Sequence, residues 1–283
     1  MKTNILIFSK NRTLQLKSLL LSMRYFTDID ETRITILYVQ DDPEVDFQPL
    51  KDEFKCRFYE QVSFLQDIKN IVADFDGDYI QFMVDDLIFR DNINYTEIEK
   101  LLDSNSDIDA FQCRLGYNIK CGKEPEFTQI DKFICWNTSS DIGKYWNYFW
   151  ELTSGIYRRN LVQAYIDKCR PHREFFPNPF EDHFYTCMPN TNPRPSFIVN
   201  LVNAVRFCFK RKSHKIASYE QSKCYTMGVN LVADIDDDRE QKFDTASLHK
   251  KMLDGYLIDF KSLKDALPEK PNAASPFFKL IKE

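Results

Sequence analysis

Glycine is scarce in this chain, with only 7 residues in 283. No glycine-rich loop stands between a predicted strand and a helix, so the phosphate-binding loops of the Rossmann and P-loop classes are excluded. A nucleotide, if one binds, must therefore be held by side chains and by the ends of strands.

Long apolar runs and closely spaced cysteine pairs are also missing. No stretch reaches the roughly 20 apolar residues of a membrane span, and the N-terminal run Asn4–Phe8 is too short for a signal peptide. The 8 cysteines form no CxxC pair and are scattered as buried thiols are. These absences predict a cytoplasmic, reduced protein without a transmembrane segment, and peripheral contact with a membrane stays open.

Positive charge is not in excess. The sequence has 38 Lys and Arg against 43 Asp and Glu, and its net charge of −5 argues against general binding of nucleic acid. The chain is 43% apolar, 14% aromatic and 29% charged, which is typical of a soluble globular protein with ample core. We therefore expect a single domain over residues 1–283.

Strand and helix patterns alternate over the first third of the chain. Short apolar runs predict strands, and apolar side chains with a period near 3.6 predict helices. The predicted strands are Asn4–Phe8, Arg33–Val39, Lys55–Tyr59 and Tyr79–Val84, and the predicted helices are Thr13–Phe26 and Ser63–Phe75. This order predicts an α/β fold with a mostly parallel central sheet flanked by helices. Later helical and irregular patterns predict a C-terminal lobe.

Two adjacent carboxylates interrupt the most apolar segment of this region. Tyr79–Val84 is typical of a strand buried on both faces, and Asp85 and Asp86 follow it before apolar residues resume. Buried acids cost free energy unless a cation or several hydrogen-bond donors compensate them. The carboxyl end of a parallel strand is also where open α/β sheets bind ligands. We therefore predict a site for a divalent metal ion and phosphate; the alternative is a turn with two solvated aspartates.

Polar side chains follow other predicted strands as well. They are Ser9 and Arg12 after the first strand, Asp41 and Asp42 after the second, and Glu181 and Asp182 later in the chain. In a parallel sheet these strand ends converge on one crevice. There Asp41 could bind a ribose or base, and Asp86 could hold a metal ion that bridges two phosphates. Arg12 or Lys69 could neutralise the phosphates, although each residue alone could equally be an ordinary surface charge.

Four segments, in order, resemble one family. Phe8–Leu16, with the leucine-rich helix behind it, is similar to the opening of A-type-fold glycosyltransferases near family 2, which use nucleotide sugars. Phe82–Phe89 is similar to their metal-binding Asp-any-Asp stretch, and Pro179–Phe184 to the acidic pair that supplies a general base in inverting members. Phe243–Asp259 resembles the C-terminal helix and turn of a bacterial subgroup. The resemblance covers nearly the whole chain and implies a fold like that of nucleotide-diphospho-sugar transferases.

The resemblance assigns a metal site with one departure. The first acid of Asp-any-Asp falls on Val84, so Asp86 would be the direct ligand of Mn²⁺ or Mg²⁺, and Asp85 would contact ribose or a metal-bound water. Metal independence stays open because one carboxylate is missing. His214 would be a further metal ligand. It lies in the basic cluster Lys210–Lys215, which could instead bind the diphosphate or an anionic lipid-linked acceptor, or be a solvated turn.

The acidic pair on Pro179–Phe184 supplies the expected catalytic residues. In an inverting transfer a carboxylate takes the proton of the attacking acceptor hydroxyl. We expect Asp182 to be this base and Glu181 to hold an acceptor hydroxyl. The alternative is that Asp182 caps a helix that begins at residue 183.

Aromatic residues cluster between residues 136 and 150. Sugar rings stack on such side chains, so Trp136, Trp146 and Trp150 are candidates for acceptor binding. Backbone donors near Gly155 could contribute to the same subsite. Packing in the core is an equally good interpretation of the three tryptophans.

Together these features predict a cytoplasmic, inverting glycosyltransferase that moves a sugar from a nucleotide-diphosphate donor to a glycan or lipid-linked acceptor. The resemblance places this step in bacterial surface-polysaccharide assembly. Residues 1–115 would form a nucleotide-binding half, 116–215 an acceptor-side half and 216–283 the C-terminal lobe. Two alternatives are a metal-dependent phosphohydrolase or nucleotidyltransferase, and a non-catalytic nucleotide- or carbohydrate-binding homologue. The sequence leaves the sugar, the base, the acceptor and the oligomeric state undetermined.

Overall fold

The computed structural model describes residues 1–169, 176–188, 213–230, 243–272 and 278–283. Strands from most of this range form one central sheet. They are β1 (Thr3–Lys10), β2 (Ile34–Val39), β3 (Arg57–Glu60), β4 (Tyr79–Val84), β6 (Ile108–Gln112), β7 (Thr128–Ile130), β8 (Phe133–Asn137), β9 (Gly155–Arg158) and β10 (Lys215–Tyr219). Two further strand pairs are β5 (Leu87–Phe89) with β11 (Cys224–Thr226), and β12 (Tyr256–Ile258) with β13 (Leu280–Lys282).

Helices alternate with the strands in the first half of the chain. They are α1 (Thr13–Phe26), α2 (Gln48–Glu53), α3 (Phe64–Asp74), α4 (Tyr95–Ser104), α5 (Arg159–Lys168), α6 (Pro177–Cys187) and α8 (Thr245–Leu253), with 3₁₀ turns at Glu31–Arg33 and Ser262–Asp265. The strands and helices predicted over the first third of the sequence are all present, with small shifts at their ends.

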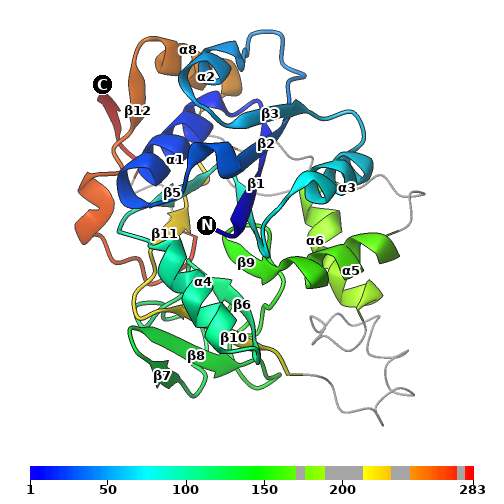
Figure 1. Ribbon diagram of the computed structural model, residues 1–283. Coiled ribbons are helices and arrows are strands. Elements are labelled where there is room, and N and C mark those ends of the chain that lie inside the picture. The colour runs from blue at the N-terminus through cyan, green and yellow to red at the C-terminus, as the bar shows by residue number, and fades with distance from the viewer. Residues whose placement is uncertain (170–175, 189–212, 231–242, 273–277) are drawn as a thin grey trace.

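The central sheet has nine strands within the described residues, in the order β3-β2-β1-β4-β9-β6-β10-β8-β7 (Figure 1). Strands β3, β2, β1 and β4 are parallel neighbours. Strands β9 and β8 run opposite to the other strands of the sheet. The predicted α/β fold with a mostly parallel central sheet flanked by helices is therefore confirmed.

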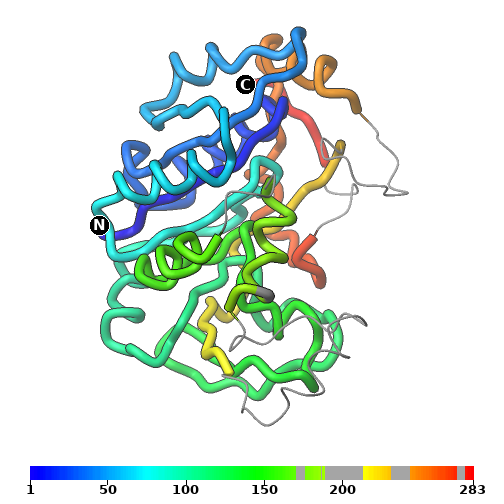
Figure 2. Tube along the Cα trace, turned by 90° about the vertical axis from the view of Figure 1, so that its right-hand side faces the viewer, coloured from blue at the N-terminus to red at the C-terminus, as the bar shows by residue number. Residues whose placement is uncertain are grey.

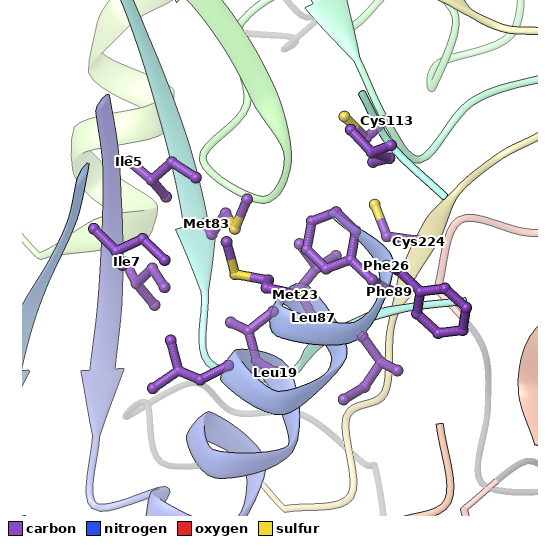
Figure 3. Packing of buried hydrophobic residues seen from close by; sticks show 14 of the residues in the cluster. Ile5, Ile7, Leu19, Met23, Phe26, Met83, Leu87, Phe89, Cys113 and Cys224 are labelled. Atoms are coloured by element: carbon purple, nitrogen blue, oxygen red, sulfur yellow. The ribbon is translucent and has the colours of Figure 1, made fainter. Parts of the chain in front are cut away.

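Alternation along the central strands sorts their side chains into two cores. Ile5 and Ile7 of β1 enter one core and Leu6 and Phe8 enter the other, since successive residues of a strand point to opposite faces. Helices α1 and α4 cover the first face, and α3, α5 and α6 cover the second. Figure 3 shows the first core, where side chains of α1 such as Met23 face Ile5 and Ile7. The sheet is thus buried on both sides, which leaves its strand ends as the place for polar chemistry.

The C-terminal segments pack against α1. The Thr13 hydroxyl and His249 Nδ1 are 2.8 Å apart, and the Ile258 N–H donates to the Ser18 hydroxyl at 2.9 Å. Helix α8 and strand β12 accordingly lie beside the N-terminal helix in both views (Figures 1 and 2). No helix within the described residues has the length and apolar character to cross a bilayer. The divisions at residues 115 and 215 stay a prediction, and β10 runs across the second of them.

Candidate functional site

A cavity of about 820 Å³ opens at the carboxyl ends of β1, β2 and β4. Its strand-end wall carries Ser9, Lys10, Arg12, Val39, Asp85 and Asp86. A second part of the wall carries Lys144, Tyr145, Tyr148, Thr153 and Glu181, and the C-terminal part of the chain adds Thr226, Gly228, Asn230 and Asn272. The fold thus brings five of the predicted site residues into one cavity: Ser9, Arg12, Asp85, Asp86 and Glu181.

Asn11 shapes the strand-end wall. Its φ of 54° lies in the left-handed region, which asparagine adopts more readily than most residues. Its side-chain oxygen accepts the N–H groups of Asp41 at 3.1 Å and Asp42 at 3.3 Å. Its own N–H donates to the Val39 carbonyl at 3.1 Å. These bonds tie the end of β1 to the end of β2 and turn the chain into α1, with Arg12 at the N-cap position.

Asp85 is a buried acid whose two oxygens are both engaged. One oxygen accepts from the Ser9 hydroxyl at 2.9 Å and the Lys10 N–H at 3.2 Å, and the other accepts from Arg12 at 3.0 Å. Burial raises the pKa of Asp85 to about 6, because loss of water disfavours the charged form more than Arg12 and the hydrogen bonds favour it. Asp85 therefore holds the Ser9 side chain, the Lys10 backbone and the Arg12 side chain together at the strand ends.

Arg12 lies between the two aspartates. Its Nη1 is 3.0 Å from Asp85 Oδ1 and 3.2 Å from Asp86 Oδ2, and its Nη2 donates to the Asn230 carbonyl. The Arg12 side chain is 10% exposed, against 4% for Asp85 and 17% for Asp86. A nearly buried cation thus joins both carboxylates, and Asp86 is the more accessible of the two.

The wall offers one accessible carboxylate to a metal ion. No group of three or more His, Cys, Asp or Glu side chains that could hold a metal ion occurs among the described residues. Mg²⁺ often binds through one or two carboxylates and takes its other ligands from water and substrate phosphates. The site fits such a shared ion, with Asp86 as the protein ligand. The described residues do not fit an ion held by protein side chains alone.

Arg114, which lines the cavity, belongs to a buried ion pair that the sequence analysis missed. Arg114, just after β6, pairs through Nη2 with Glu151 and donates through Nη1 to Asn272 at 3.0 Å. Glu151 in turn accepts the Ser154 hydroxyl at 2.7 Å. The pair joins the sheet to the loop before β9 and to the C-terminal part of the chain. No sequence spacing indicates this arrangement, because the residues come from separate segments.

Glu181 faces the cavity from α6. Its carboxylate accepts the Tyr148 hydroxyl and the Leu152 N–H, the latter at 2.7 Å. Helix α6 begins at Pro177, so Asp182 lies within the helix, and the predicted capping alternative is wrong. Asp182 is exposed and is not among the residues that line the cavity. Neighbouring residues on a helix differ in direction by about 100°, which explains how the two acids separate.

The three tryptophans lie in the second core and not in the cavity wall. Trp136, Trp146 and Trp150 are at most 1% exposed. Trp150 stacks on Phe184 with ring centres 4.4 Å apart and planes 4° apart, and Trp136 donates to the Trp146 carbonyl at 2.8 Å. This placement matches the core-packing alternative, because a fully buried ring has no face free for a sugar.

His214 also lies away from the cavity. It is 3% exposed, its ring stacks on Phe149 at 3.8 Å, and its Nδ1 is 3.1 Å from Asp109 Oδ2. It directly precedes β10, whose first residue pairs with the first residue of β6, whereas Arg114 at the cavity follows the other end of β6. The structure therefore does not bring His214 to Asp86. The basic residues 210–212 lie outside the described residues.

Three further predicted residues are not among those that line the cavity. Asp41 is 55% exposed and pairs with Lys10 at 3.0 Å, and the hydrogen bond from Asn11 is the main cause that lowers its pKa. Lys69 lies on α3 and is not among the lining residues. Gly155 begins β9, where an added Cβ would lie 2.3 Å from the Tyr157 hydroxyl oxygen, so glycine is needed there for close packing.

Comparisons with known proteins give one match in sequence. No family model matches the chain. The chain is 26% identical over 189 residues to the bifunctional glycosyltransferase pgtA of Dictyostelium discoideum, a match that covers 58% of this chain and 25% of that protein. The match thus spans about a quarter of this curated relative.

Two solved structures match this chain at low TM-scores. TarS 1-349 of S. aureus in complex with UDP-GlcNAc has a TM-score of 0.49 and 14% identity, covering 87% of this chain and 61% of that chain. The mannosyltransferase PcManGT of Pyrobaculum calidifontis in complex with GDP-Man and Mn²⁺ has a TM-score of 0.35 and 11% identity, covering 58% and 46%. At these TM-scores we rest no conclusion on the likenesses. The match to pgtA confirms the resemblance to a glycosyltransferase that the ordered motifs indicated.

Proposed function

We propose that the protein is a glycosyltransferase that moves a sugar from a nucleoside-diphosphate donor to an acceptor hydroxyl. One observation carries the proposal: a single cavity has the Arg12–Asp85–Asp86 cluster on one part of its wall and the Glu181 carboxylate on another. The first part suits a diphosphate with its cation, and the second suits an acceptor that must lose a proton. The sequence similarity to pgtA supports the same activity.

The proposed donor site uses the strand-end wall. Asp86 would hold a Mn²⁺ or Mg²⁺ ion that it shares with the two phosphates, and this ion would neutralise charge on the leaving nucleotide. Lys10 and Lys144 line the same cavity and could add positive charge near the phosphates. The loop between β1 and α1, held by Asn11 against the end of β2, keeps the donor wall in place.

The proposed transfer inverts the configuration at the anomeric carbon. The acceptor oxygen attacks that carbon from the face opposite the diphosphate, and its proton goes to the Glu181 carboxylate. The bond from the anomeric carbon to the phosphate oxygen breaks, and the nucleoside diphosphate leaves with the bonding electron pair. Tyr148 and the Leu152 N–H hold the carboxylate in position. We prefer Glu181 over Asp182 as the base because Glu181 lines the cavity.

The acceptor is proposed to be a glycan or a lipid-linked glycan. Tyr145 and Tyr148 line the cavity on the side of Glu181 and could contact the apolar face of a sugar ring. A cytoplasmic role in the assembly of a surface polysaccharide follows from the motif resemblance and belongs to the same proposal.

The test is an assay for turnover of nucleotide sugars. Purified protein is incubated with UDP- and GDP-linked hexoses and N-acetylhexosamines, with Mn²⁺ or with EDTA, and with simple glycosides as acceptors. We expect release of nucleoside diphosphate with a glycosylated product from at least one donor, and loss of this activity in Asp86→Asn. Release of inorganic phosphate or pyrophosphate would instead indicate a phosphohydrolase or nucleotidyltransferase. Binding of a nucleotide without any turnover would indicate a non-catalytic homologue.

A further inference from the structure

We propose that Arg12 is the resident cation of the Asp85–Asp86 pair, and that a divalent metal ion therefore binds this site only together with a nucleoside diphosphate. The proposal rests on the function proposed above, since it concerns the order in which the donor site is filled. Arg12 would thus compensate both aspartates and make metal binding depend on the nucleotide, which an ordinary strand-end cation does not do.

The first step concerns how firmly Arg12 is held. Its guanidinium contacts Asp85 at 3.0 Å, Asp86 at 3.2 Å and the carbonyl of Asn230. These three partners come from the turn after β4 and from the C-terminal part of the chain, so they enclose the side chain from separate segments. Breaking a buried ion pair leaves a charge without compensation, which is strongly unfavourable. Arg12 is therefore a permanent part of the wall and does not leave it for an incoming metal ion.

The second step concerns the ligands that remain for a metal ion. Both Asp85 oxygens already accept hydrogen bonds, from Ser9 and Lys10 on one side and from Arg12 on the other. Asp86 is left as the accessible carboxylate, and one of its oxygens also contacts Arg12. Affinity for divalent cations depends on the number of charged ligands and on how well the site surrounds the ion. A single shared carboxylate beside a guanidinium is a poor site for an ion alone.

The third step concerns the charge that each ligand meets. Two carboxylates and one guanidinium leave one net negative charge in the cluster. This negative charge opposes the binding of a diphosphate at the cluster, and among the described residues a metal ion alone would find one accessible carboxylate there. When both bind, the phosphates supply oxygen ligands to the ion and the ion reverses the sign of the wall. Each ligand therefore raises the affinity for the other, and this coupling must be reciprocal.

The test measures Mn²⁺ binding by electron paramagnetic resonance of the free ion, and nucleotide binding by calorimetry. The wild type is titrated with MnCl₂ alone, with UDP or GDP alone, and with MnCl₂ in the presence of each nucleotide. Arg12→Met removes the resident cation and leaves two carboxylates. Lys10→Met is the matched control, because Lys10 lies in the same cavity but its side chain pairs with Asp41.

We expect one nucleotide to raise the affinity of the wild type for Mn²⁺ by at least about tenfold, within the usual range for coupled ligands. Arg12→Met should bind Mn²⁺ alone at least about tenfold more tightly than the wild type, since no guanidinium then competes with the ion for the Asp86 oxygen. Lys10→Met should not gain this binding. Mn²⁺ should also raise the melting temperature of Arg12→Met more than that of the wild type.

Two results would overturn the inference while leaving the proposed function intact. One is tight binding of Mn²⁺ to the wild type without nucleotide, and the other is nucleotide binding that Mn²⁺ does not change. If neither nucleotide binds under any condition, the proposed donor site is wrong, and the coupling to a diphosphate falls with it. In that case the comparison of Arg12→Met with the wild type in MnCl₂ alone still decides whether Arg12 excludes the ion. If Arg12→Met does not fold, the wild-type titrations alone decide the coupling.

Discussion

The choice of base on α6 makes the sharpest prediction. Glu181 lines the cavity, whereas Asp182, the next residue, is exposed and does not. Replacing Glu181 with Gln keeps the size of the side chain but removes its ability to take a proton. General-base catalysis contributes roughly 10²–10⁴-fold to a rate, so kcat should fall by about this factor in Glu181→Gln.

The structure indicates that this variant will fold. The carboxylate accepts the Tyr148 hydroxyl and the Leu152 N–H. Glutamine keeps one oxygen for the Leu152 N–H, and the Tyr148 hydroxyl can turn to accept from the new amide group. Exchanging two hydrogen bonds to a charged group for two neutral ones costs about 1–3 kcal/mol in total. This is less than the roughly 5–15 kcal/mol by which folded proteins are usually stable.

The assay follows release of nucleoside diphosphate in the presence of donor and acceptor, together with the dissociation constant of the nucleotide. Glu181→Gln should lose turnover and keep its nucleotide affinity, because the donor binds another part of the wall. Asp182→Asn is the matched control and should keep both. Normal turnover in Glu181→Gln, with loss of turnover in Asp182→Asn, would refute the reasoning and return the role of base to Asp182.

Three other predictions concern stability and use urea unfolding. Trp150→Ala should lower the free energy of unfolding by about 3–5 kcal/mol, because it leaves a large cavity in the core; a loss near zero would mean that the ring is not packed as described. Arg114→Met should cost about 3–5 kcal/mol, because Glu151 stays buried without its partner, and the second change Glu151→Gln should recover much of this; no recovery would argue against the ion pair. Burial lowers the pKa of His249, so below its ordinary pKa of about 6.5 the unfolded chain takes up the proton first. The stability of the wild type should therefore fall as the pH drops from about 6.5 through this lowered pKa, and His249→Gln should lose that part of the pH dependence; identical profiles would contradict it.

Much of the fold could be predicted because its signals are local. The alternation of Ile5 and Ile7 with Leu6 and Phe8 requires a strand with two buried faces wherever it is placed. Such a strand needs helices on both sides, and the order of strands and helices then favours parallel pairing. The strand-end wall follows from the same logic, because polar residues directly after parallel strands must meet at one edge.

Other side chains were predicted in the wrong place because composition does not determine which way a side chain points. The aromatic cluster that contains Trp136 suits a sugar platform and a core equally well, and only its packing beneath α6 decides between them. For the acidic pair, the start of α6 at Pro177 turns Glu181 toward the cavity and leaves Asp182 exposed. His214 was expected near Asp86 from the resemblance, yet it precedes β10, which runs toward the cavity and leaves His214 at the other end.

From the sequence alone follow the sheet, its flanking helices and the acids at the ends of β2 and β4, since each depends on neighbouring residues. The tertiary structure decided the rest of the site. Arg12 meets the Asn230 carbonyl and Arg114 meets Glu151 only because segments far apart in the chain cross at the edge of the sheet. Local patterns do not encode such crossings. The packing of the two cores against the sheet decides which distant segments meet. The charges of the cavity are balanced where those segments meet.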